Sequence, residues 1–142
     1  MRTRPDYYYT QSAALPYRVQ GDALEILLIT TRRSKRWIIP KGIVEGDLTP
    51  YASAAKEALE EAGVQGRIDS TPLGVYDYVK WGDVCCVSVY ALRVDAALTA
   101  WPEDFRTREW VSPDEAARRV RETELKTLIR EFAARIEAHD AA

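Results

Sequence analysis

The sequence of 142 residues is poor in the side chains that build several common catalytic centres. Histidine occurs once, at His139, and the only two cysteines, Cys85 and Cys86, are neighbours. A lone histidine disfavours Ser-His-Asp, Cys-His and His-ligated metal chemistry. Adjacent cysteines cannot staple distant segments, which disfavours a disulfide scaffold or a Cys-rich zinc site and favours a reducing compartment. Any metal site must therefore use carboxylates, which suit Mg²⁺ or, as an alternative, Mn²⁺.

Long apolar runs and a strong net charge are also missing. No stretch approaches the ~20 apolar residues that a membrane helix needs. Residues 1–10 contain no continuous apolar run, so we expect no secretory signal. The formal net charge of −2 gives no general attraction to nucleic acid or to an acidic membrane. We therefore expect a cytoplasmic protein that binds neither a membrane nor nucleic acid. The sequence leaves open whether it is a monomer or a homodimer.

The chain length fits a single domain spanning residues 1–142, with residues 1–10 as an N-terminal arm. Alternation and β-branched content predict several strands, and a loop is expected over 41–48. A capping pattern at Ser112, Pro113 and Glu115 begins a helix, and apolar spacing predicts a last helix near 125–136. This mixture predicts an α/β (α+β) fold with a mixed sheet between helices. The expected strands are 12–18, 23–30, 37–39, 67–79, 84–94 and 107–111.

One further helix is well signalled and carries a cluster of carboxylates. Thr49 is a suitable N-cap, Pro50 suits the first helical position, and Gly63 is the expected stop. Three acids on this helix have the i, i+3, i+4 spacing of neighbours: Glu57, Glu60 and Glu61. By itself such a face is typical of a solvated helix surface. With a divalent ion between the charges, it could bind phosphate oxygens and orient an attacking water.

The surroundings of this helix resemble the Nudix box, written G-x5-E-x7-R-E-U-x-E-E-x-G-U, where U is a bulky aliphatic residue. The residues that match in register are Gly42, Glu57, Glu60, Glu61, Gly63 and Val64. The resemblance implies a Nudix-type α/β/α sandwich and a MutT-like hydrolase that cleaves a pyrophosphate bond in a small phosphoanhydride with Mg²⁺. Similarity to the diadenosine and diphosphoinositol polyphosphate hydrolase branch extends over roughly 11–132, through Trp37-Ile38-Ile39-Pro40 and Arg108-Glu109-Trp110.

The resemblance implies roles for individual residues. Glu57 and Glu61 would bind the metal with the backbone carbonyl of Lys41, and Glu60 would be a further metal carboxylate. Glu60 also occupies the position of the general base in this branch, with Glu57 as the alternative base. Gly42 would let the backbone approach the metal without obstruction from a side chain.

Two positions depart from the box. Leu48 replaces its first Glu, and Lys56 replaces its Arg, so the ion pair that the family forms between these positions cannot form here. Because the helix carboxylates remain, we predict a variant active site. A non-catalytic nucleotide sensor with a degenerate box is the alternative. Glu45 and Asp47 are either solvated loop acids or water-mediated metal contacts.

Substrate contacts are expected from a basic turn and from positions that the resemblance adds. Arg32, Arg33 and Arg36 could clamp phosphates through bidentate hydrogen bonds, although such a turn is also typical of a soluble hairpin. The resemblance adds substrate contacts at Lys41, Gly42, Arg108 and Lys126.

The choice of substrate depends partly on one cysteine. Cys86 stands where eukaryotic diphosphoinositol enzymes carry an Arg, which favours a dinucleoside polyphosphate over an inositol pyrophosphate. An RNA 5′ end remains a further alternative, although the acidic overall charge disfavours it. Tyr17, Trp81 and Trp101 are candidates for stacking on a base, or else they fill core and turn positions.

Overall fold

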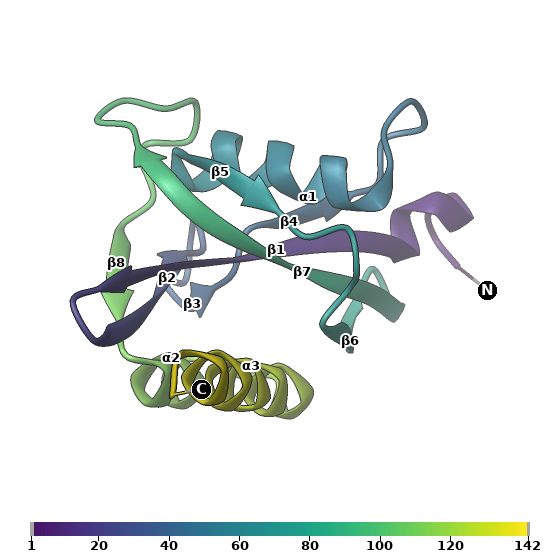
Figure 1. The fold of residues 1–142 in the computed structure, drawn as a ribbon. Coiled ribbons are helices and arrows are strands. Elements are labelled where there is room, and N and C mark those ends of the chain that lie inside the picture. Colours follow the sequence, from purple (N-terminus) through teal and green to yellow (C-terminus); the bar gives the residue numbers. More distant parts are fainter. Residues whose placement is uncertain (1, 142) are drawn as a thin grey trace.

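The computed structural model describes residues 2–141 and the side chains as far as Glu137, so the side chain of His139 lies outside the described part. Eight strands form one mixed sheet (Figure 1). Among residues 2–141, no helix is long and apolar enough to cross a membrane. The strands are β1 (Thr10–Gln20), β2 (Ala23–Thr30), β3 (Trp37–Ile38), β4 (Lys41–Ile43), β5 (Val64–Ile68), β6 (Gly74–Lys80), β7 (Asp83–Ala97) and β8 (Arg108–Val111).

The centre of the sheet is the parallel pair β1 and β7, and all other strand pairs are antiparallel. The main order is β3-β2-β1-β7-β5, while β4 pairs with β1, β6 with β7, and β8 with β2. A parallel pair needs a crossover, and the chain makes it through the helix that carries the carboxylates. The predicted mixed sheet between helices is confirmed.

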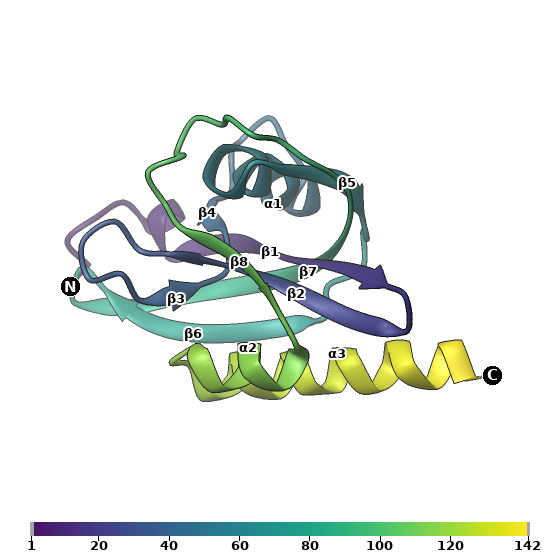
Figure 2. The same cartoon turned by 90° about the vertical axis from the view of Figure 1, so that its left-hand side faces the viewer.

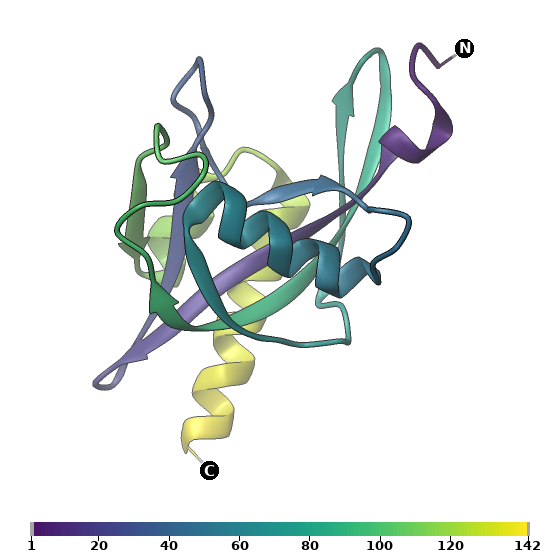
Figure 3. The same ribbon diagram turned by 90° about the horizontal axis from the view of Figure 1, so that it is seen from above.

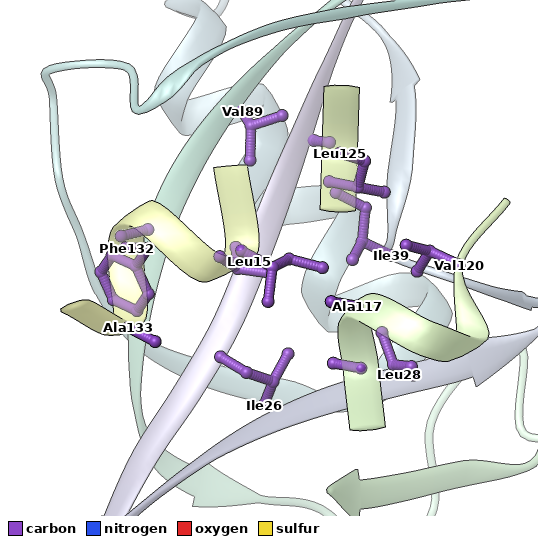
Figure 4. Packing of buried hydrophobic residues seen from close by; sticks show 14 of the residues in the cluster. Leu15, Ile26, Leu28, Ile39, Val89, Ala117, Val120, Leu125, Phe132 and Ala133 are labelled. Carbon is purple, nitrogen blue, oxygen red and sulfur yellow. The ribbon is translucent and has the colours of Figure 1, made fainter. Parts of the chain in front are cut away.

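Helices cover both faces of the sheet (Figure 2). Helix α1 (Pro50–Glu57) lies on one face, where Leu27, Ala54, Ala58 and Leu92 belong to one buried cluster. Helices α2 (Pro113–Arg119) and α3 (Thr123–Ala141) cover the other face. There they enclose a larger core with the inward side chains of β1, β2 and β7 (Figure 4). This core includes Leu15, Ile26, Leu28, Ile39, Val89, Ala117, Val120, Leu125, Phe132 and Ala133.

The helix that follows the loop has the predicted ends but a different interior. The Thr49 side chain accepts a hydrogen bond from the amide of Ala52 at 3.2 Å, and Gly63 ends the helix with a φ of 67°. Between them, α1 continues as a π-helical turn, η2 (Ala58–Ala62). Such wide turns are rare and are frequently found at functional sites.

Two predicted segments differ from the structure. The expected strand 67–79 is interrupted: β5 and β6 pair with β7 one after the other, and residues 69–73 loop out between partners Leu92 and Val89. Pro72 in this loop has no N–H for a ladder, and the Asp69 carboxylate accepts a hydrogen bond from the amide of Thr71 at 3.0 Å. The expected loop 41–48 begins as the short strand β4. The chain end before β1 forms a 3-10 turn, η1 (Asp6–Tyr9), beside the β6–β7 hairpin (Figure 3).

Candidate active site

Two of the three helix carboxylates meet. Glu57 ends α1 and Glu61 lies one turn later in η2, and the two carboxylates are close enough to interact electrostatically. The amide of Lys41 in β4 donates to Glu61 Oε1 at 3.2 Å, which ties this strand to the helix. A β-carbon at position 42 would overlap the Glu57 carboxylate, so any other residue there would displace this side chain. Strand β4 and the helix therefore form one unit around the carboxylate pair.

The charges of this pair are unfavourable without a counter-ion. Burial, together with the neighbouring carboxylate of Glu61, raises the pKa of Glu57 to about 8. Burial also raises the pKa of Glu61, although the positive charge of Arg106 opposes that shift. Desolvation lowers the pKa of the Lys41 side chain, which lies 4.8 Å from the centre of the Tyr78 ring. A site that disfavours two adjacent negative charges gains stability when a cation binds between them.

The loop between β7 and β8 holds the end of the helix in place. Trp101 Nε1 donates to the carbonyl oxygen of Glu61 at 3.0 Å. The amide of Glu103 donates to the carbonyl oxygen of Glu60 at 3.0 Å. The Arg108 guanidinium donates to the carbonyl of Ala62 at 2.8 Å, and it stacks on the Trp101 ring. Carbonyl groups at the end of a helix lack hydrogen-bond donors within the helix, and this loop supplies the donors. It thereby fixes the backbone that carries Glu61.

The third carboxylate, Glu60, lies on a different side of the helix. Its carboxylate is 38% exposed and 3.8 Å from Lys56 Nζ. Lys56 Nζ in turn contacts both carboxylate oxygens of Glu45, at 2.8 and 2.9 Å. The family's ion pair between positions 48 and 56 is absent, as Leu48 requires, but another ion pair still joins the box loop to the helix. The carboxylate lost at Leu48 is replaced by Glu45, three residues earlier in the same loop, which still reaches Lys56.

A cavity of about 900 Å³ opens beside the Glu57–Glu61 pair. It lies between β4, the basic turn after β2, the β6–β7 hairpin and the connection between α2 and α3. Acidic, basic and aromatic side chains all line it, so it can accept a ligand with both charged and flat parts. The lining residues are Tyr8, Gln11, Thr31, Arg32, Arg36, Ile38, Lys41, Gly42, Ile43, Glu57, Glu61, Asp77, Tyr78, Val79, Lys80, Trp81, Arg106, Arg121 and Glu122.

The basic part of the lining has unused hydrogen-bonding capacity. Arg36 Nε is buried and has no hydrogen-bond partner within the described part of the chain. The Arg32 guanidinium stacks on the ring of Phe105 at 4.1 Å, which holds the basic turn against the β7–β8 loop. Arg106, by contrast, already donates hydrogen bonds to the carbonyl oxygen of Thr30 at 2.9 Å and to the Glu103 carboxylate at 2.8 Å. A buried donor without a partner is costly unless an anion accepts its hydrogen bond.

Several predicted site residues do not line this cavity. Arg33 is exposed, and Glu60 faces Lys56. Arg108 holds the helix end as described above. Lys126 Nζ donates to the carbonyls of Ala117 at 2.7 Å and Val120 at 2.6 Å, so it caps the end of α2.

The sequence pattern missed part of the lining. Arg106 lies in an irregular loop, and Arg121 and Glu122 lie in a short connection between helices, where no periodicity marks a residue. Tyr8 belongs to the arm, and its position beside the cavity depends on long-range packing against Trp81. In β6, Tyr76 is buried in the core, whereas Asp77 and Tyr78 line the cavity. No local sequence pattern indicates that these two residues reach the cavity.

Comparison with known proteins agrees with the geometry. A family model described as NUDIX domain matches residues 10–134. The chain is 33% identical to "Nudix hydrolase 13, mitochondrial" of Arabidopsis thaliana over 85% of this chain and 71% of that protein. It is 30% identical to human "Diphosphoinositol polyphosphate phosphohydrolase 3-alpha" over 79% of this chain and 69% of that protein.

A solved structure shares the fold. The C. elegans Ap4A hydrolase structure superposes with a TM-score of 0.76, covering 90% of this chain and 98% of that one at 21% identity. The family model covers most of the chain. The chain belongs to the Nudix hydrolase family.

Proposed function

We propose that this chain hydrolyses a pyrophosphate bond in a nucleoside diphosphate-linked compound, with Mg²⁺ as cofactor and a dinucleoside polyphosphate as the preferred substrate. Membership of the Nudix hydrolases supports phosphoanhydride hydrolysis of small molecules in general. The substrate, the metal and the site residues are parts of the proposal. A cytoplasmic location likewise remains a prediction.

The observation that carries the proposal is the division of charge in the cavity. The carboxylates of Glu57 and Glu61 line it on the helix side. Basic groups line the same cavity, including Arg32, Arg36 and Arg106. A chain of phosphates bound there would meet guanidinium donors at its oxygens while its reacting phosphorus approached the carboxylates.

The residues present fit a divalent cation. Glu57 and Glu61 supply hard oxygen ligands, and their mutual repulsion favours a positive charge. Gly42 leaves room for the Glu57 carboxylate where a side chain would displace it. These two carboxylates, with the backbone carbonyl of Lys41 and with Glu60 as a further candidate, would hold the ion. When bound, Mg²⁺ neutralises phosphate charge and lowers the pKa of water. Among the side chains that the structure describes, which end at Glu137, no three acidic, His or Cys groups converge in a metal-binding cluster, so the proposal relies on the pair.

The proton of the attacking water needs an acceptor, and two residues are candidates. Glu60 is the base that the resemblance implies, and Glu57 is the alternative that lines the cavity. The base must lie within hydrogen-bond reach of the water. Replacing each by Gln and following kcat against pH distinguishes them, because only loss of the base removes the acidic limb of the profile.

The test is a substrate screen with Mg²⁺, in which products are identified by mass. The panel contains dinucleoside polyphosphates, nucleotide sugars, deoxynucleotides and inositol pyrophosphates. We expect fastest turnover of a dinucleoside polyphosphate and a loss of at least about a hundredfold in Glu61→Gln. Glu131→Gln, which changes an exposed carboxylate of α3, is the matched control and should keep full activity.

Two outcomes of this screen would contradict the proposal. Near-normal turnover in Glu61→Gln would remove the site assignment. Tight binding of a nucleotide without Mg²⁺-stimulated release of phosphate would make the chain a sensor instead.

An inositol pyrophosphate is the second candidate substrate, because a human relative carries that activity in its name and the cavity is rich in arginine.

A further inference from the structure

The turn that joins β6 and β7 contains an unexpected residue. Trp81 and Gly82 connect the strands with φ values of 54° and 74°. A two-residue hairpin with both φ values positive favours Asn, Asp or Gly at its first position. A bulky side chain in this conformation is strained. In residues 2–141, only Lys35 and Trp81 adopt a positive φ without being glycine. The sequence thus keeps a tryptophan where the backbone disfavours it.

Burial does not explain this choice. The Trp81 side chain is only partly buried, outside both hydrophobic cores. Its ring lies 5.2 Å from that of Tyr8 in an edge-to-face contact, and both residues line the cavity. The indole also contacts the N-terminal arm at Tyr9, whose ring is 5.9 Å away, and at the Arg4 guanidinium, 5.7 Å away. Two further contacts attach the arm to the hairpin without the indole. Thr3 donates to the backbone carbonyl of Trp81 at 2.9 Å, and Arg2 pairs with Asp83 at 2.9 Å.

We propose that Trp81 determines specificity by stacking its indole on a nucleobase of the substrate, with the nearly perpendicular ring of Tyr8 completing an aromatic wall beside it. Strain that persists at a cavity is a reason to look for a function of the side chain. A saturated inositol ring has no π face for this wall, whereas every nucleobase has one. Asp77 and Glu122 also line the cavity, and their negative charge disfavours a ligand with phosphates on all sides. The proposal rests on the proposed function and narrows its substrate to a base-bearing compound.

The proposal predicts opposite changes in stability and affinity. Trp81→Asn relieves the backbone strain, so its Tm should rise by about 2–5 °C. The same variant loses the stacking surface, so its affinity for ADP should fall roughly tenfold. Lys35→Asn is the matched control for stability, because it relieves the same strain in another turn, and its Tm should rise as well. Trp81→Phe keeps an aromatic ring and should retain most of the ADP affinity.

The experiment measures ADP binding by calorimetry in EDTA, together with KM and kcat with Mg²⁺ for a dinucleoside polyphosphate and an inositol pyrophosphate. For Trp81→Asn we expect weaker ADP binding and a higher KM for the nucleotide substrate, with kcat within about twofold of wild type. ADP affinity within twofold of wild type in Trp81→Asn would overturn the proposal. An equal loss in Trp81→Phe and Trp81→Asn would overturn it too. Because ADP binding needs no turnover, this result stands apart from any failure of the proposed catalysis.

Discussion

Replacing Glu57 by Gln should stabilise the metal-free protein at alkaline pH while strongly lowering its activity. The pKa of Glu57 is raised from 4.5 to about 8, so the folded state favours its protonated form. The stability gained from this preference is complete below pH 4.5 and is lost as the pH rises toward 8. At full value, such a shift corresponds to roughly 5 kcal/mol above pH 8. Glu57 is partly exposed, and solvent screening reduces this to roughly 1–2 kcal/mol.

Thermal unfolding in EDTA at pH 5 and pH 8 measures the effect. At pH 8, Glu57→Gln should unfold roughly 3–8 °C above wild type, because a kcal/mol shifts the Tm of a domain of this size by several degrees. At pH 5 the two proteins should differ little. Added Mg²⁺ should stabilise wild type and leave the variant unchanged. Glu60→Gln is the matched control, because this carboxylate is more exposed and faces Lys56. A difference between wild type and Glu57→Gln that is the same at both pH values would refute the reasoning.

Three further substitutions test other parts of the site. Glu45→Gln breaks the ion pair with Lys56 and should weaken the activation of the enzyme by Mg²⁺. Adding Leu48→Glu to this variant should restore the activation. An unchanged Mg²⁺ titration in Glu45→Gln alone would mean that the ion pair does not position the loop. Arg36→Ala should raise KM roughly 10- to 100-fold, because a hydrogen bond to a charged group contributes ~1.5–3 kcal/mol. An unaltered KM would exclude a contact between Arg36 and a substrate phosphate. Arg108→Ala leaves helix-end carbonyls without partners and should lower the free energy of unfolding by about 2–4 kcal/mol with KM unchanged. A raised KM at normal stability would instead favour the substrate contact that the resemblance implies.

Local signals predicted much of the fold. The cap at Thr49 and the stop at Gly63 bound the helix correctly, because each is set by a single residue and its nearest neighbours. Neighbouring strand residues point to opposite faces, and in β7 Cys85 is buried while Cys86 is exposed. The interruption at residues 69–73 was missed, because both flanking segments are strands that pair with β7 one after the other.

The candidate site was predictable only where its spacing is local. Glu57 and Glu61 lie four residues apart on one helix, so sequence spacing brings them together. The π-helical turn η2 was not predictable from that spacing, because hydrogen bonds from a distant loop accompany it at its end. Glu45 was left unpaired in the prediction because the motif assigns the partner of Lys56 to position 48, whereas the folded loop brings Glu45 to the helix. Arg106 and Trp81 join the cavity through tertiary packing alone.

The most direct test of the central claim is hydrolysis in heavy-oxygen water. Wild-type protein, Mg²⁺ and a dinucleoside polyphosphate are incubated in water labelled with heavy oxygen, and the masses of the products are measured by mass spectrometry. If Glu57 and Glu61 form the metal site of a pyrophosphohydrolase, one heavy oxygen enters one phosphate product per turnover. That incorporation should require Mg²⁺ and should disappear in Glu61→Gln. Binding of the same compound without incorporation, or incorporation that persists in EDTA and in Glu61→Gln, would contradict the account.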